Sequence, residues 1–221
     1  MSRVSPVPPA ASRLAIVLSH PTQYYAPWFR WLRANTGLVF RVFYLWDFGV
    51  KATRDRQFGR TFAWDVDLLD GYEHEFVPNT GADPGTHHFW GLRNPGAIDR
   101  LRKWQPDMIL LFGYKYATHV RILAWARWRG IPLLFRGDSH FMGRRTPSGL
   151  QRMALTVLYR QFAAITYVGE ANRDYFTALG VTASKMFFAP HAVDDHLSVS
   201  YTHLRAHETK ANLVCRLLLE K

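Results

Sequence analysis

The sequence of 221 residues contains a single cysteine, Cys215. One thiol cannot form an internal disulfide, and a metal site of the CxxC type is excluded. No apolar stretch approaches the roughly 18 to 20 residues that span a bilayer, and residues 1–12 lack the apolar segment of a secretory signal. The glycine-rich motifs of nicotinamide enzymes and P-loop kinases are also absent. We therefore expect a soluble, cytoplasmic protein that belongs to neither of those enzyme classes.

Positive charge and apolar residues are, by contrast, abundant. Lys and Arg number 28 against 17 Asp and Glu, which gives a formal net charge of +11. Hydrophobic residues make up 48% of the chain and aromatic residues 15%, enough to build a buried core. The charge favours anionic partners, which include nucleic acid, acidic lipid headgroups and phosphorylated substrates, and does not choose among them.

From residue 13 onward, short apolar runs alternate with segments of helical periodicity. The expected strands are 13–19, 38–46, 72–77, 108–112, 132–135, 164–168 and 185–189. The expected helices are one that begins near Pro27 and those at 98–104, 119–129, 150–162 and 171–179. This alternation predicts an α/β fold with a Rossmann-like, doubly wound parallel sheet and right-handed crossovers. The connections 47–64 and 79–94 are unusually long, which is typical of functional rims or mobile segments.

Ligands of such sheets bind beyond the carboxyl ends of the strands, so three loops are candidate site segments. These loops are 19–24, 113–116 and 136–145. In the first, His20, Gln23 and Tyr24 are expected to line a cleft between the end of a strand and the start of the next helix. Such a junction can bind a phosphate or a sugar hydroxyl. In the second, Gly113 allows the chain to turn and Tyr114 can line a sugar-binding surface.

The third loop carries a cation, a carboxylate, a hydroxyl and an imidazole between residues 136 and 140. We predict catalytic roles for His140, which can deprotonate a hydroxyl, and for Asp138, which can fix the tautomer of that imidazole. Arg136, Ser139 and Arg144 are predicted substrate contacts. The alternative is that Asp138 and Ser139 only shape the turn while Arg136 makes a structural ion pair.

Two further segments bear on what the chain contains. His87 and His88 show no ligand-spaced partner in the sequence, so no metal site is predicted. The pieces VSYTHLRAHET and NLVCRLLLEK resemble the translated frame of a sequencing-library adapter, so we expect residues 199–221 to be non-native. The alternative is a genuine amphipathic helix. Without this segment the chain keeps 24 Lys and Arg against 15 Asp and Glu, a net charge of +9.

The segment 168–197 resembles the closing stretch of the amino-terminal domain in family 4 retaining glycosyltransferases. The matching positions are Asn172, Tyr175, Phe176, Leu179, Gly180, Val181, Pro190, Val193 and Asp194. The stretches SHPTQYYAPWFRWL, WDVDLLDGYEHEF and LLFRGDSH are similar to one branch of that family, which acts on bacterial surface or secondary-metabolite glycans. The chain departs from many members at His20-Pro21-Thr22, where they have a Gly-Gly loop, so contact of that loop with the donor phosphates is in doubt.

The resemblance implies the amino-terminal half of a GT-B fold, whose first domain mainly takes the acceptor and whose second takes the sugar nucleotide. The implied organisation is a disordered tail at 1–12, the acceptor-side domain at 13–190, a truncated hinge at 191–198 and the adapter peptide at 199–221. The implied activity of the full-length parent is metal-independent sugar transfer from a nucleotide diphosphate sugar to a glycan or lipid-linked acceptor, with retention and no further cofactor. The isolated chain is expected to be inactive.

Two other interpretations stay open. The basic charge also suits a module that binds nucleic acid or an anionic membrane surface, and the second of these is compatible with an enzyme held at the inner membrane face. A sugar-nucleotide epimerase with the GT-B fold is the other alternative.

Overall fold

In the computed structural model, the described residues are 12–50, 53–54, 61–62, 67–141 and 147–191. The chain divides into two compact units, residues 1–190 and 191–221. The described helices and strands all belong to the first unit. The peptide 199–221, which we expect to be non-native, lies outside the described residues, as does nearly all of the expected tail and hinge.

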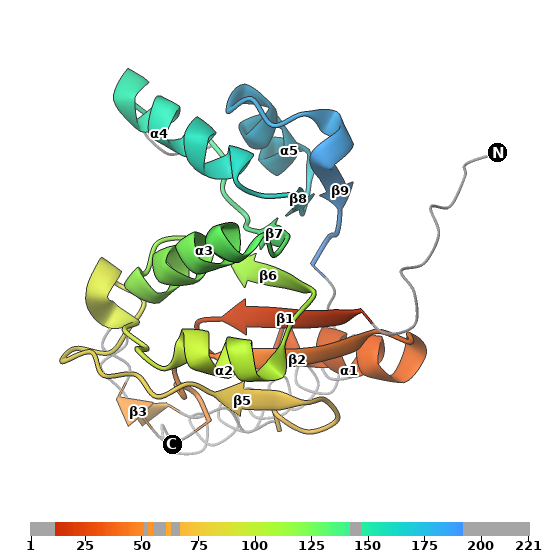
Figure 1. Cartoon of the computed structure of the whole chain (residues 1–221), viewed down its shortest axis with the longest axis vertical. Coiled ribbons are helices and arrows are strands. Elements are labelled where there is room, and N and C mark those ends of the chain that lie inside the picture. Colours follow the sequence, from red (N-terminus) through yellow and green to blue (C-terminus); the bar gives the residue numbers. More distant parts are fainter. Residues whose placement is uncertain (1–11, 51–52, 55–60, 63–66, 142–146, 192–221) are drawn as a thin grey trace, which may run out of the picture. The chain divides into compact units, whose positions relative to one another are not determined.

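Seven parallel strands form one sheet in the order β5-β2-β1-β6-β7-β8-β9 (Figure 1). The strands are β1 Arg13–Leu18, β2 Val39–Tyr44, β5 His74–Phe76, β6 Met108–Phe112, β7 Leu133–Arg136, β8 Ala164–Tyr167 and β9 Met186–Phe188. In the centre of the sheet, Ile16 of β1 is paired with Val42 of β2 and with Leu110 of β6. The predicted Rossmann-like α/β fold is confirmed, and each predicted strand occurs within a few residues of its expected bounds.

The helices follow the strands as the alternating pattern predicts. They are α1 Ala26–Asn35, α2 Ala97–Trp104, α3 Ala117–Arg129, α4 Gly149–Arg160 and α5 Glu170–Ala178. Gly130 ends α3 in the left-handed conformation, as expected for a glycine after a helix. A capping box between Ser148 and Gln151 begins α4. Among the described helices, none combines the length and apolar character that crossing a bilayer requires.

Four short elements were not predicted from the sequence. They are the 3-10 helices η1 Phe89–Gly91 and η2 Ala183–Lys185, and the antiparallel pair β3 Thr53–Arg54 and β4 Thr61–Phe62. Unlike β5 and β9, which are also three residues long, they do not belong to the expected alternation of parallel strands and helices, so the sequence pattern does not reveal them.

The core lies on both faces of the sheet because side chains alternate along β1. Leu14, Ile16 and Leu18 pack with Phe29 of α1 on one face. Ala15 and Val17 pack on the other face in a cluster that includes residues of α2, α3, α4 and α5. Figure 1 shows α2 and α3 covering this second face. Burial on both sides accounts for the uninterrupted apolar sequence of the strand.

The strand order reverses once, between β1 and β6. From β1 the chain moves outward through β2 to β5, then returns to β6 and continues in the opposite direction to β9. All neighbouring strands of this sheet are parallel, so their carboxyl ends meet at one edge. The first connections of the two halves therefore diverge at the carboxyl ends of β1 and β6, which is where open α/β sheets form a binding crevice.

Candidate functional site

The three loops singled out in the sequence follow β1, β6 and β7, which are neighbours in the sheet. Their bases are in contact through aromatic side chains. The ring of Tyr25, at the start of α1, lies 4.8 Å from that of Phe112 at the end of β6, measured between centroids. The guanidinium of Arg136, at the end of β7, lies 5.7 Å from the Tyr25 ring and 5.9 Å from the Phe112 ring. The fold thus brings the three loops to one edge.

His20 lies immediately beyond β1 in a half-buried position. Its Nδ1 is 2.9 Å from the hydroxyl of Ser19, and its ring makes edge contacts with Trp46 and Phe48. Burial lowers the pKa of His20 to about 4, so the imidazole is neutral at pH 7. A neutral imidazole both donates and accepts a hydrogen bond, which suits contact with a hydroxyl better than contact with a phosphate. Gln23 and Tyr24, on the same loop, are exposed.

Gly113 turns the chain at the end of β6 with a φ of 106°, a conformation that strongly favours glycine. The turn that the sequence predicts for this residue is present. The neighbouring Tyr114 is half-buried, and its ring lies 6.0 Å from Phe135 and 5.9 Å from Tyr159 between centroids. These contacts place much of Tyr114 in the core, so packing is one of its roles. Contact with a substrate stays a prediction.

Arg136 is a buried cation held mainly by backbone carbonyls. Nη1 donates to the carbonyl of Ala189 at 2.8 Å, and Nη2 to that of Pro190 at 3.4 Å. The guanidinium also lies 5.6 Å from the Trp28 ring centroid, close enough for a cation–π interaction. Among the described residues no carboxylate forms an ion pair with it, so that part of the chain does not contain the structural ion pair considered as an alternative. The buried Nε has no hydrogen-bond partner.

The hydrogen bond expected between Asp138 and His140 is absent, and that part of the sequence interpretation is wrong. Asp138 is exposed, whereas Nδ1 of His140 is buried and has no hydrogen-bond partner. Other residues hold the loop instead. Asn172 of α5 donates to the carbonyl of Ser139 at 2.6 Å, and the Phe141 ring packs 4.7 Å from that of Tyr175. Catalytic roles for His140 and Asp138 stay predictions, and Arg144 lies outside the described residues.

Asn94 is a fully buried anchor that the sequence did not reveal. Its side-chain amide donates to the carbonyls of Leu45 and Val77, at 2.9 and 2.8 Å, just beyond β2 and β5. Its side-chain oxygen accepts from the hydroxyl of Thr118, in the first turn of α3, at 3.0 Å. One amide therefore ties three elements together behind the carboxyl edge. A single Asn in a polar connection gives no signal of such a role.

His119, beside Thr118, is also fully buried and was not singled out in the sequence. Neither ring nitrogen has a hydrogen-bond partner in the structure. The ring lies 5.3 Å from that of Tyr116 and borders the backbone of Gly113. Burial lowers the pKa of His119 to about 4, so this imidazole is neutral near pH 7. The position matched the helical pattern of α3, which predicts burial but not an unsatisfied polar group.

His87 and His88 do have a ligand-spaced partner, contrary to the sequence interpretation. Nε2 of His87 lies 3.1 Å from Oδ2 of Asp83, and Nε2 of His88 lies 3.7 Å from the same oxygen. One ligand atom from each of the three side chains lies within 4.8 Å of the others. The signal that could have revealed this is the spacing of four residues between Asp83 and His87. Spacing along the sequence does not show that His88 also approaches the Asp83 carboxylate.

The chain is similar to solved structures but matches no family model. A search of curated proteins also finds no match. Membership of glycosyltransferase family 4 therefore stays a prediction. Among solved structures, the UDP-GlcNAc 2-epimerase from Neisseria meningitidis bound to UDP-GlcNAc is similar, with a TM-score of 0.48 and 14% identity over 90% of this chain and 52% of that one.

The UDP-N-acetylglucosamine 2-epimerase from Rickettsia bellii has a TM-score of 0.47 and 16% identity, over 81% of this chain and 45% of that one. The chain thus spans about half the length of these two enzymes. At TM-scores and identities this low, the likeness assigns neither a substrate nor a reaction to the present chain.

Proposed function

We propose that this chain forms the acceptor-side domain of a glycosyltransferase that uses a nucleotide diphosphate sugar. The observation that carries the proposal is the reversal of strand order between β1 and β6. The loops after β1 and β6 diverge there, and open α/β sheets commonly form a binding crevice at such a position; the loop after β7 is next in the sheet. The groups on these loops are polar and mostly uncharged at neutral pH, which suits the hydroxyls of a glycan acceptor.

Two imidazoles supply the proposed proton chemistry. His20 is kept neutral by burial, and Nδ1 of His140 has no hydrogen-bond partner among the described residues. In the proposed arrangement His140 takes the proton of the acceptor hydroxyl as that oxygen bonds to the anomeric carbon of the donor sugar. The bond from that carbon to the diphosphate breaks and the nucleoside diphosphate leaves, while Gln23 and Tyr24 bind neighbouring hydroxyls. Arg136 contributes positive charge near the crevice while keeping its structural contacts.

The residues that carry the family resemblance support the proposal through their positions. Asn172 is buried and joins two segments, because its oxygen accepts from the backbone of Val168 at 3.0 Å while its amide holds Ser139. Phe176 is fully buried, and Gly180 follows α5 with a φ of 78°. The similarity therefore falls on residues that shape the loop of His140, which a chance match in an exposed segment would not do.

The proposal includes a second, donor-binding domain that completes the active site, and it makes the isolated chain inactive. It requires no metal for the transfer step. We further propose a cytoplasmic enzyme whose basic surface contacts the inner face of an anionic membrane, where a lipid-linked acceptor is presented.

The test uses the protein extended through its genomic reading frame beyond residue 198. We expect it to transfer sugar from a nucleotide diphosphate sugar to an added glycan or lipid-linked acceptor, and we expect the 221-residue chain to show no transfer. His140→Ala should lower kcat by about 100-fold or more if His140 acts as a base. His74→Ala, which changes a half-buried histidine on β5 away from the crevice, is the matched control and should retain activity.

Three outcomes would contradict the proposal. Unchanged transfer in the His140→Ala variant would remove its proposed base. Conversion of the nucleotide sugar to an epimer in the absence of any acceptor would establish the epimerase alternative. Retention on DNA that falls steeply with salt, with no response to nucleotide sugars, would indicate a nucleic-acid-binding module instead.

A further inference from the structure

The connection between β5 and α2, residues 77–96, is long but held in place by a dense set of hydrogen bonds. Asn79 organises its base, since its side-chain oxygen accepts from the backbone of Gly81 and Arg93, and its amide donates to the carbonyl of Gly91. Thr80 pairs with Arg93 through backbone and side chain. Together with the buried Asn94, these bonds fix both ends of the connection.

Two glycines set the conformation of the outer part of this connection. The backbone amide of Gly85 donates to the carbonyl of Gly91 at 3.1 Å. A Cβ atom at Gly91 would lie 2.1 Å from the carbonyl oxygen of Gly85, and one at Gly85 would lie 2.5 Å from Nδ1 of His87. Neither position accommodates a side chain without a shift of its surroundings. The close packing brings His87 and His88 back toward Asp83.

The three side chains converge with spacings close to those of a zinc site. Zinc bound tetrahedrally at about 2.0–2.1 Å requires its ligand atoms to lie about 3.3 Å apart. Oδ2 of Asp83 is 3.1 Å from Nε2 of His87 and 3.7 Å from Nε2 of His88. The two imidazole rings pack edge to face with centroids 4.6 Å apart, and one ligand atom from each of the three side chains lies within 4.8 Å of the others.

We propose that Asp83, His87 and His88 bind a divalent transition-metal ion, with Zn²⁺ as the cation of choice. Two imidazoles and one carboxylate form a ligand set that zinc accepts, and three protein ligands leave a fourth position for water or another group. Nε2 of His88 lies 3.0 Å from the backbone carbonyl of Asp83, which keeps the ring near the carboxylate in the absence of an ion. Binding requires that this nitrogen carry no proton, which the other neutral tautomer provides.

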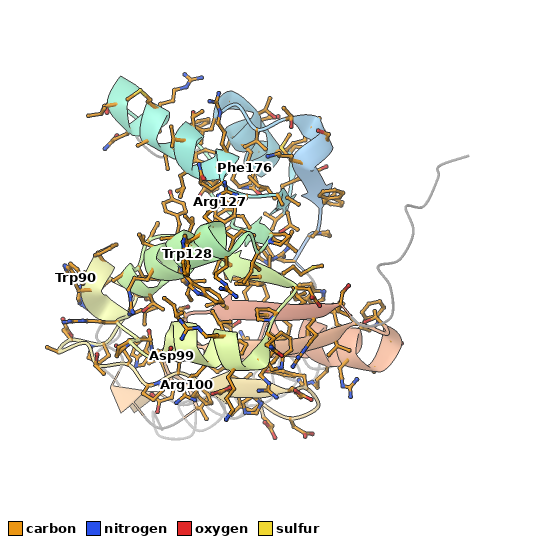
Figure 2. All side chains as sticks on the ribbon, viewed as in Figure 1. Trp90, Asp99, Arg100, Arg127, Trp128 and Phe176 are labelled. Carbon is orange, nitrogen blue, oxygen red and sulfur yellow. The ribbon has the colours of Figure 1, made fainter. Side chains whose placement is uncertain are left out.

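The site lies on the side of the molecule to which the carboxyl ends of the strands lead. The hydroxyl of Tyr116, directly before α3, donates to the carbonyl of Thr86 at 3.1 Å. The exposed Phe89 and Trp90 follow His88 directly, and Trp90 lies at the outer end of the connection in Figure 2. Half of the His87 side chain is exposed, so an ion can enter from solvent. This inference does not depend on the proposed glycosyltransferase activity.

Calorimetric titration of the metal-free 221-residue chain with Zn²⁺ tests the site. We expect one equivalent to bind to the unaltered chain, and the affinity of the His87→Asn/His88→Asn variant to be at least about tenfold weaker. The matched control is His203→Asn/His207→Asn, which removes two histidines outside the described residues and should leave the affinity unchanged. Zn²⁺ should also raise the melting temperature of the unaltered chain and of the control, but not of the His87→Asn/His88→Asn variant.

Equal binding by the unaltered chain and the His87→Asn/His88→Asn variant would overturn the proposal, as would loss of binding in the control alone. Asp83→Asn provides a second check because it keeps the size of the side chain and removes only the negative charge. It too should weaken Zn²⁺ binding at least about tenfold, and unchanged affinity would exclude the carboxylate as a ligand. Circular dichroism of each variant shows whether the fold is retained.

Discussion

The loop after β7, residues 137–141, and the connection after β5, residues 77–96, both leave the carboxyl edge of the sheet but are held in different ways. Contacts from α5 hold the first: Asn172 binds the carbonyl of Ser139, and Tyr175 packs on Phe141. Side-chain amides hold the second: Asn79 bonds to Gly81 within the connection, and Asn94 donates to the carbonyl of Leu45 beyond β2. The first leaves an imidazole nitrogen without a partner, whereas the second places two imidazoles beside one carboxylate.

The difference shows that residues which position reactive side chains need not be reactive themselves. The amides of Asn94 and Asn172 take no part in the proposed chemistry, yet their hydrogen bonds decide where His87 and His140 lie. A buried amide with several partners is costly to remove because each former partner is left unsatisfied in a low-dielectric environment. We therefore expect substitution of Asn94 or Asn172 to lower the free energy of unfolding more than substitution of His87 or His140.

The sharpest test of this comparison is Asn94→Ala. The substitution leaves the carbonyls of Leu45 and Val77 and the hydroxyl of Thr118 without their amide partner. We expect the free energy of unfolding to fall by about 3–5 kcal/mol, as measured by urea denaturation. The control is Asn35→Ala, at the exposed end of α1, which should change it by about 0.5 kcal/mol or less. Equal effects of the two substitutions would mean that Asn94 is not an anchor.

The same buried amide shows where inference from sequence stops. The strands and helices were predictable because their apolar patterns reflect burial directly: Ile16 stands in a continuous apolar run buried on both faces, and Phe29 recurs at helical spacing. The identity of the three edge loops followed from strand order, since parallel strands end together. The partners of Asn94, Arg136 and His140 were not predictable, because each depends on segments distant in sequence. Asp138 lies two residues from His140, yet proximity along the chain does not produce a hydrogen bond between them.

Acid should destabilise the fold through His119 of α3, whose ring packs against Tyr116, the residue that donates to Thr86 of the β5 connection. Its pKa is about 4 in the folded protein and about 6.5 in the unfolded chain, so the folded state favours the neutral imidazole. The stabilisation is complete above pH 6.5 and is lost as the pH falls from 6.5 toward 4, by about 3 kcal/mol in total. His20 adds a loss of the same sign. Unfolding measured from pH 7 to pH 4 should show this slope.

The variant His119→Gln isolates the contribution of that residue. It should flatten the decline in stability between pH 6.5 and pH 4, even if its stability at pH 7 is lower than that of the unaltered chain. A slope that His119→Gln does not alter would show that the ring is solvated or paired in solution.

On the β7 side, Arg136→Met tests whether the cation is mainly a structural residue. Methionine retains much of the apolar contact with Trp28 and Tyr25 but loses both hydrogen bonds to the carbonyls of Ala189 and Pro190. We expect a loss of about 2 kcal/mol in the free energy of unfolding. Arg33→Met, on the exposed side of α1, is the control and should have little effect. A neutral result for Arg136→Met would leave anion binding as the better explanation for this buried charge.

The smallest expected effect belongs to Tyr116→Phe, which removes a single hydroxyl that supports the β5 connection. The phenylalanine ring keeps its packing against His119 but cannot donate to the carbonyl of Thr86. We expect the free energy of unfolding to fall by about 0.5–1 kcal/mol. Zn²⁺ affinity should fall severalfold, because the segment that carries His87 and His88 loses one of its supports. Tyr24→Phe, on an exposed tyrosine of the β1 loop, should change neither quantity. If Tyr116→Phe leaves Zn²⁺ binding intact, then the hydrogen bonds of Asn79 and Asn94 suffice to hold the ligands.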